Sequence, residues 1–189
     1  MSRMRVRQAG FTLIESIVGI VILGFALSVL VLGVYTSSTK SHQATYQAQA
    51  AALGHSIMTD VLSRQFDENS DPNGGQYRCG ENDDNPCSTG LGKDGTDGLT
   101  SVSFNDVDDF IGCWGELSIC SSNSLPSYQL NQLIDATSAA EYKNFTVEIN
   151  VAYADVENSE TKTQLKKIDI TLYASSYAQY TFSAYRGNY

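Results

Sequence analysis

Acidic and amide side chains gather at two places in the chain, where their oxygen atoms could bind a cation. The first group follows a predicted helix and the second lies in the run NDVDDF; together they comprise Asp67, Asn69, Asp71, Asp106, Asp108 and Asp109. Oxygen ligands at alternate positions are typical of calcium loops. However, Pro72 interrupts the first group, and no glutamate occupies its closing position. The sequence therefore offers a weak calcium site, and solvated loop acids that keep the surface soluble are the favoured alternative.

The cysteines form two closely spaced pairs in segments rich in glycine, asparagine, aspartate and serine: Cys79, Cys87, Cys113 and Cys120. Their spacings are too wide for the usual zinc-binding motifs, and in an exported chain such cysteines form disulfides. The short separations and intervening turn formers favour Cys79 with Cys87 and Cys113 with Cys120, because local loops close at low entropic cost. A crossed pairing is the alternative.

Residue patterns for catalysis are missing from the sequence. The histidines, His42 and His55, have neither a nearby cysteine nor the HExxH spacing of a metalloprotease, and no GxSxG, P-loop or GxGxxG motif occurs. The chain has 12 basic and 21 acidic residues, a formal charge of -9, so it lacks a basic surface for nucleic acid. We predict a protein that is not an enzyme, needs no cofactor apart from the candidate calcium, and binds no nucleic acid.

Glu15 is the single charge in an apolar segment that follows three arginines. This segment, from Phe11 to Tyr35, exceeds the roughly 20 apolar residues that a transmembrane helix needs. The basic flank predicts a single-pass chain with a cytoplasmic N-terminus and an exported body. A carboxylate in hydrocarbon costs roughly 2.5–3.5 kcal/mol on insertion scales, so Glu15 should have a partner or a function. A plain signal anchor would leave the glutamate unexplained.

The run GFTLIE, from Gly10 to Glu15, together with the apolar helix after it, resembles the N-terminus of type IV prepilins and of the pseudopilins of type II secretion. The resemblance implies that a membrane peptidase cuts after Gly10, that the new amine of Phe11 is N-methylated, and that Glu15 aids assembly. The implied partners are other pilin subunits, the prepilin peptidase and methyltransferase, the inner-membrane assembly machinery and membrane lipid. Unlike many major pilins, this chain has no proline in the helix.

Beyond the membrane segment, apolar residues at spacings of three and four predict that the helix continues to Phe66 as an amphipathic helix. The stripe consists of Tyr46, Ala50, Leu53, Ile57 and Val61. Two later runs of alternating apolar residues, FTVEINVAYAD and LKKIDITLYAS, predict an antiparallel hairpin, and YTFSAY a third strand. The expected fold is α+β and type IV pilin-like, with the long N-terminal helix packed against a small antiparallel sheet.

These patterns divide the chain into a cleaved leader (1–10), a transmembrane and filament-core half of the helix (11–35), an amphipathic exported half (36–66) and a disulfide-stapled body (67–189). Within the family, RCGE, SDPNGG and NDVDDF resemble minor pilins of the mannose-sensitive haemagglutinin (MSHA) pilus. This resemblance implies a minor subunit of an adhesive surface pilus, anchored in the inner membrane before assembly and extracellular afterwards. The alternatives are a minor pseudopilin of type II secretion, which shares the N-terminal motif, and a membrane-anchored calcium-dependent binding module.

Overall fold

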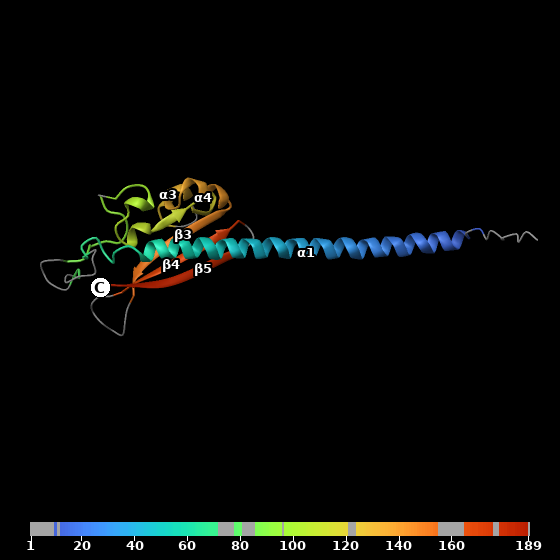
Figure 1. Ribbon diagram of the computed structural model, residues 1–189, viewed down its shortest axis with the longest axis horizontal. Coiled ribbons are helices and arrows are strands. Elements are labelled where there is room, and N and C mark those ends of the chain that lie inside the picture. Colours follow the sequence, from blue (N-terminus) through green and yellow to red (C-terminus); the bar gives the residue numbers. More distant parts are fainter. Residues whose placement is uncertain are drawn as a thin grey trace, which may run out of the picture. The chain divides into compact units, whose positions relative to one another are not determined.

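The computed structural model describes residues 10, 12–71, 78–80, 86–95, 97–120, 124–154, 165–175 and 178–188. Its contacts divide the chain into two compact units, Met1–Thr45 and Tyr46–Tyr189. One long helix, α1 (Leu13–Leu62), contributes residues to both units (Figure 1). The second unit holds the sheet and the short helices, and we refer to it as the body.

Helix α1 ends at Leu62 and not at Phe66, where the apolar pattern predicted its end. Gln65 leaves the helical path because its amide donates a hydrogen bond to the Asn105 carbonyl over 3.2 Å, in an isolated bridge with Asp106. Phe66 is nevertheless 2% exposed. The pattern was right about the burial of this residue and wrong about its helical conformation, since contacts with a distant loop decide the backbone path.

A five-stranded sheet with the order β2-β1-β3-β4-β5 forms the centre of the body. Its strands are β1 (Gly112–Trp114), β2 (Ser127–Tyr128), β3 (Phe145–Tyr153), β4 (Leu165–Ala174) and β5 (Ala178–Gly187). Strand β1 runs parallel to β2, and all other neighbouring strands are antiparallel. The predicted hairpin and third strand are confirmed as β3, β4 and β5, and the α+β fold class is confirmed with them.

Short helices lie in the connection from α1 to β1 and in the connections between β1, β2 and β3. They are η1 (Ser101–Ser103), η2 (Asp108–Phe110), α2 (Leu117–Cys120), α3 (Leu130–Leu133) and α4 (Ala136–Glu141). Helix α4 is capped by Asp135, whose carboxylate accepts hydrogen bonds from the amides of Thr137 and Ser138.

The core of the body lies between the C-terminal turns of α1 and the sheet (Figure 1). The inward residues of β3 and β4 alternate with outward ones, and they are buried together with the stripe of α1: Leu53, Ile57, Val61, Val147, Ile149, Val151, Ile168, Ile170 and Leu172. Full burial of such a side chain contributes about 1.5–3 kcal/mol. The two sequence periods, one helical and one extended, therefore meet in a single core.

Gly54 marks a close approach of α1 to the sheet. A Cβ atom built on this residue would lie 2.5 Å from Phe182 Cε2 and 3.0 Å from Leu172 Cδ1. Glycine is the residue that permits such an approach, because it has no side chain. The residue therefore has a packing role that outweighs its low helix propensity.

Replacing Gly54 with alanine should destabilise the body. The gain in helix propensity is about 1 kcal/mol, whereas forcing atoms into a packed core typically costs about 1–3 kcal/mol, and Gly54→Val should cost more. Gly33→Ala is the matched control, because a Cβ at Gly33 would meet nothing within 4 Å. Denaturant unfolding, followed by the emission of the single tryptophan, measures both changes. Equal midpoints for Gly54→Ala and Gly33→Ala would contradict the close approach.

Candidate functional site

The N-terminal motif begins α1 with a capping threonine. The Glu15 amide donates to Thr12 Oγ1 over 3.4 Å, and the Ser16 amide donates to the Thr12 carbonyl over 3.2 Å. The segment TLIE thus has the sequence of a capping box, in which a threonine is followed three residues later by glutamate. Its position in the first turn places the Glu15 carboxylate near the positive end of the helix dipole.

Gly10, the predicted cleavage residue, is exposed, and a Cβ built on it would meet no atom within 4 Å. The chain itself would therefore accept a larger residue at this position, so any effect of such a substitution on cleavage would arise in the peptidase. Phe11, the predicted methylation site, and the leader residues 1–9 lie outside the described residues.

The segment Leu13–Tyr35 of α1 is long and apolar enough to cross a membrane, judged by length and composition alone. Its large apolar side chains are exposed, as Phe25 illustrates with 73% of its surface accessible. A continuous apolar surface of this extent requires another apolar phase around it, which lipid or other apolar helices can supply.

Residues 5–31 match the family model of the prokaryotic N-terminal methylation motif. The chain carries this methylation motif. The match supports a type IV pilin or pseudopilin, which is a structural subunit processed by a prepilin peptidase and assembled with other pilins. Pilins and pseudopilins share the methylation motif, so it does not separate them. No curated protein and no solved structure matches the chain.

Two of the candidate calcium ligands, Asp67 and Asp108, meet at a buried lysine on β4. Lys166 is fully buried, and its Nζ donates to Asp108 Oδ1 and, over 2.5 Å, to the Phe66 carbonyl. The same nitrogen lies 3.8 Å from Asp67 Oδ2. The two acidic groups that are separate in the sequence therefore form one cluster, with Lys166 as the cation between them.

The carboxylates of this cluster also accept hydrogen bonds from backbone amides. Asp67 accepts from Ser88 over 3.1 Å, and Asp108 accepts from Gly92 over 3.1 Å. Asp106 Oδ1 accepts from the amides of Asp108 and Asp109, and Asp109 Oδ2 accepts from those of Asn105 and Asp106. Each carboxylate thus holds a loop of the body in place.

The remaining candidate ligands lie nearer the surface. Asn69 donates its amide to Asp67 Oδ1 over 3.1 Å and its side-chain nitrogen to the Pro86 carbonyl over 3.1 Å. Asn69 therefore links Asp67 to the segment at Pro86. Asp71 is half-buried.

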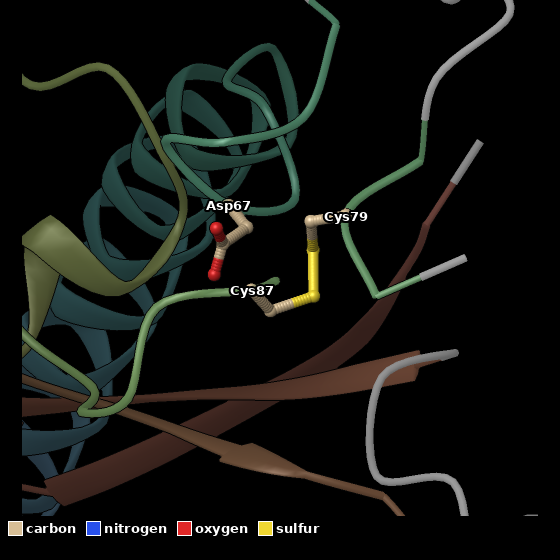
Figure 2. A group of neighbouring side chains, drawn as sticks. All are labelled: Asp67, Cys79 and Cys87. Atoms are coloured by element: carbon tan, nitrogen blue, oxygen red, sulfur yellow. A yellow bond between two sulfur atoms is a disulfide. The ribbon is translucent and has the colours of Figure 1, made fainter. Parts of the chain in front are cut away.

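Cys79 pairs with Cys87 and Cys113 with Cys120, the local connectivity that we predicted. Figure 2 shows Asp67 beside the first disulfide. Asp67, Cys79 and Cys87 have a metal-binding composition, but the two sulfur atoms are bonded to each other, so neither is a thiolate ligand. This disulfide joins the loop that Asp67 holds to the segment around Cys79.

Burial changes the protonation of the acidic cluster. Desolvation raises the pKa of Asp106 to about 8, and the neighbouring Asp108 and Asp109 act in the same direction. Desolvation also raises the pKa of Asp109 to about 6, although the amides of Asp106 and Asn105 oppose the change. Burial, together with the charges of Asp67 and Asp108, raises the pKa of Tyr153 to about 12. The folded body therefore holds protons that the unfolded chain releases.

The stability of the body should fall as pH rises between about 4 and 8. In this range the folded state binds more protons than the unfolded state, so each excess proton lowers the free energy of unfolding by about 1.4 kcal/mol per pH unit. Asp106→Asn keeps an acceptor for the amides of Asp108 and Asp109 and should flatten the dependence. Denaturant unfolding at pH 5, 6.5 and 8 measures how the free energy of unfolding changes with pH in the wild type and in Asp106→Asn. The same pH dependence in both proteins would exclude the Asp106 carboxyl as its source.

Two residues of these sites were missed by sequence reasoning although a signal was present. Lys166 lies two residues before Ile168 and four before Ile170, so the strand period places it on the buried face. Thr12 precedes Glu15 at the capping-box spacing. In both cases the pattern was available, and applying it to polar residues would have identified them.

Proposed function

We propose that this chain is a minor pilin of a type IV pilus of the MSHA type, similar to minor pilin D of that pilus. It is a structural subunit that enters a surface pilus used in adhesion. The observation that carries the proposal is the methylation motif at the head of an apolar helix whose other end is part of an α+β body. The stretches RCGE, SDPNGG and NDVDDF support the MSHA type.

The proposed course begins with a single-pass inner-membrane subunit whose N-terminus is cytoplasmic. A prepilin peptidase cuts between Gly10 and Phe11, and the new amine is methylated. The assembly machinery then moves the subunit from lipid into the pilus, where Leu13–Tyr35 becomes part of the filament core and the body faces the extracellular medium. Cutting on the cytoplasmic side keeps the apolar segment attached, so one helix serves first as anchor and then as core.

The mature protein should begin at Phe11 and carry one added methyl group. Intact mass spectrometry of the protein from peptidase-competent cells measures both changes, and a retained leader or another first residue would contradict the proposal. Gly10→Val should block cleavage, because a branched side chain hinders close approach to the scissile bond. Since a Cβ at Gly10 would meet no atom within 4 Å, the variant should still be made and inserted.

The alternative is a minor pseudopilin of type II secretion, which the methylation motif fits equally well. Immunogold labelling of sheared filaments from wild-type and deletion strains separates the two. Label on pili at the shaft or tip supports the proposal. Unlabelled pili, combined with loss of protein secretion in the deletion strain, would establish the pseudopilin instead.

A membrane-anchored calcium-dependent binding module is the third function considered. It requires vacant oxygen ligands, whereas Asp67 and Asp108 hold Lys166 and loop amides. Calorimetric titration of the full-length protein with calcium tests it. Heat of binding together with a raised melting temperature would favour the module over a purely structural subunit.

A further inference from the structure

The side-chain amine of Lys93 lies among three aromatic rings. Its Nζ is 3.9 Å from the centroid of the Tyr128 ring, 4.3 Å from that of Phe104 and 4.8 Å from that of Trp114. Nζ is buried and has no hydrogen-bond acceptor among the described residues. An ammonium group that loses water without gaining an acceptor must be stabilised in another way, and the faces of aromatic rings provide this through cation–π attraction.

The three rings, which we call the aromatic cage, are held by contacts that do not involve Lys93. Trp114 and Tyr128 are register partners on β1 and β2, and their rings stack at 4.4 Å. Phe104 follows η1 and packs 6.0 Å from Trp114, measured between centroids. The indole Nε1 of Trp114 donates to the Phe110 carbonyl over 3.2 Å, which fixes the orientation of the ring. The cage is therefore organised before any ammonium group enters it.

Acidic side chains lie near the cage. Burial, the largest influence, lowers the pKa of Lys93, and the carboxylates of Asp109 and Asp97 oppose this change. Lys93 lies in a segment, residues 86–95, that has no helix or strand. It also lines a pocket of about 260 Å³, together with Asp106, Asp108 and Asp109. The three rings do not line this pocket, so an ammonium group coming from it would reach them through the space that the Lys93 side chain vacates.

We propose that the aromatic cage is a binding site for an organic ammonium group and that Lys93 fills it as an intramolecular ligand. The ligand class is a primary or methylated alkylammonium, which includes the lysine side chain of another protein. The tethered Lys93 competes at an effective concentration on the order of millimolar. An external ammonium group therefore enters the cage when Lys93 is withdrawn.

Lys93→Ala empties the cage, and Trp114, the single tryptophan of the chain, reports its occupancy. The full-length protein is kept in a maltoside detergent and sodium phosphate, because Tris and choline detergents themselves carry ammonium groups. Propylammonium chloride should change the Trp114 emission of Lys93→Ala with saturation and raise its melting temperature. Tetramethylammonium, which is charged at every pH, should do the same. At millimolar concentration, neither ion should change the Trp114 emission or the melting temperature of the wild type.

The controls separate recognition of charge from simple filling of a hole. Neutral n-butanol should bind Lys93→Ala at least about tenfold more weakly than propylammonium, because it lacks the cation–π attraction. Lys143→Ala, which removes an exposed lysine, should respond to neither ion. Equal effects of n-butanol and propylammonium, or no response of a folded Lys93→Ala to either ion, would overturn the proposal.

A measurement on the wild type keeps the proposal testable if Lys93→Ala does not fold. Ring currents of the cage should shift the ε-methylene protons of Lys93 upfield of those of exposed lysines in NMR spectra. The loss of this signal in Lys93→Arg assigns it. An ε-methylene signal of Lys93 at the position of the exposed lysines would show that its ammonium does not occupy the cage and would overturn the proposal.

Discussion

Replacing Lys166 with methionine should destabilise the body by about 3–5 kcal/mol, the cost of leaving a buried ionic partner unpaired. Lys166 is fully buried between Asp67 and Asp108, and it also donates to the Phe66 carbonyl. Methionine keeps most of the volume and removes the charge, so packing changes little. The midpoint of denaturant unfolding, followed by Trp114 emission, measures the loss.

The neighbouring residue on the same strand provides a matched control. Lys167 points to the outer face, where it pairs with Asp169 over 2.9 Å and 40% of its side chain is exposed. Exposed ion pairs contribute little to stability, so Lys167→Met should change the midpoint of unfolding very little. Adding Asp108→Asn to Lys166→Met should restore part of the stability, because one unpaired carboxylate is removed. Equal losses for Lys166→Met and Lys167→Met would show that the buried cluster does not contribute as described.

Glu15→Val should insert into the membrane and be cut after Gly10, yet be missing from sheared pili. Valine removes a polar group from the apolar segment, so insertion becomes easier. After cleavage, the new amine of Phe11 and the carboxylate of Glu15 are two poorly solvated charges. We propose that they pair between neighbouring subunits and set the axial register. Leaving such a charge unpaired costs several kcal/mol, so wild-type subunits would displace the variant almost completely.

Glu15→Gln separates this role from helix capping. Glutamine can replace glutamate in a capping box with Thr12 but carries no charge. If the charge is what assembly requires, the glutamine variant should be as deficient in the filament fraction as the valine variant. Membrane fractions of both variants, with intact mass, verify insertion and cleavage. Normal recovery of Glu15→Gln in pili would mean that the negative charge is dispensable.

Much of the fold could be predicted because two regular periods persist over long segments. The stripe from Leu53 to Val61 and the alternation through β3 and β4 both mark the core. Strands β1 and β2 were not predicted as a pair, since strands of three and two residues are too short to show a period. The end of α1 was placed too late because the bond from Gln65 to Asn105 is a long-range contact.

The candidate sites also include features that local sequence predicts and features that depend on long-range contacts. The methylation motif is contiguous, so it could be recognised from local sequence alone, whereas the roles of Gly10, Phe11 and Glu15 stay predictions. The sequence showed two separate acidic groups, whereas the meeting of Asp67 and Asp108 around Lys166 depends on how a helix end and a strand come together. The cage around Lys93 likewise joins residues from three elements, and no sequence period connects them.

The contact between Gly54 and Phe182 has a consequence for the order in which the body is made. It joins a turn of the first helix to the edge strand β5, so one wall of the core is supplied by the last of the five strands of this sheet to be synthesised. Such a contact closes a very long loop, which slows folding. The surface of α1 around Gly54 therefore stays open until β5 has been synthesised. A nonsense codon shortly before Phe182 would leave the nascent helix without its final partner and direct the chain to proteolysis.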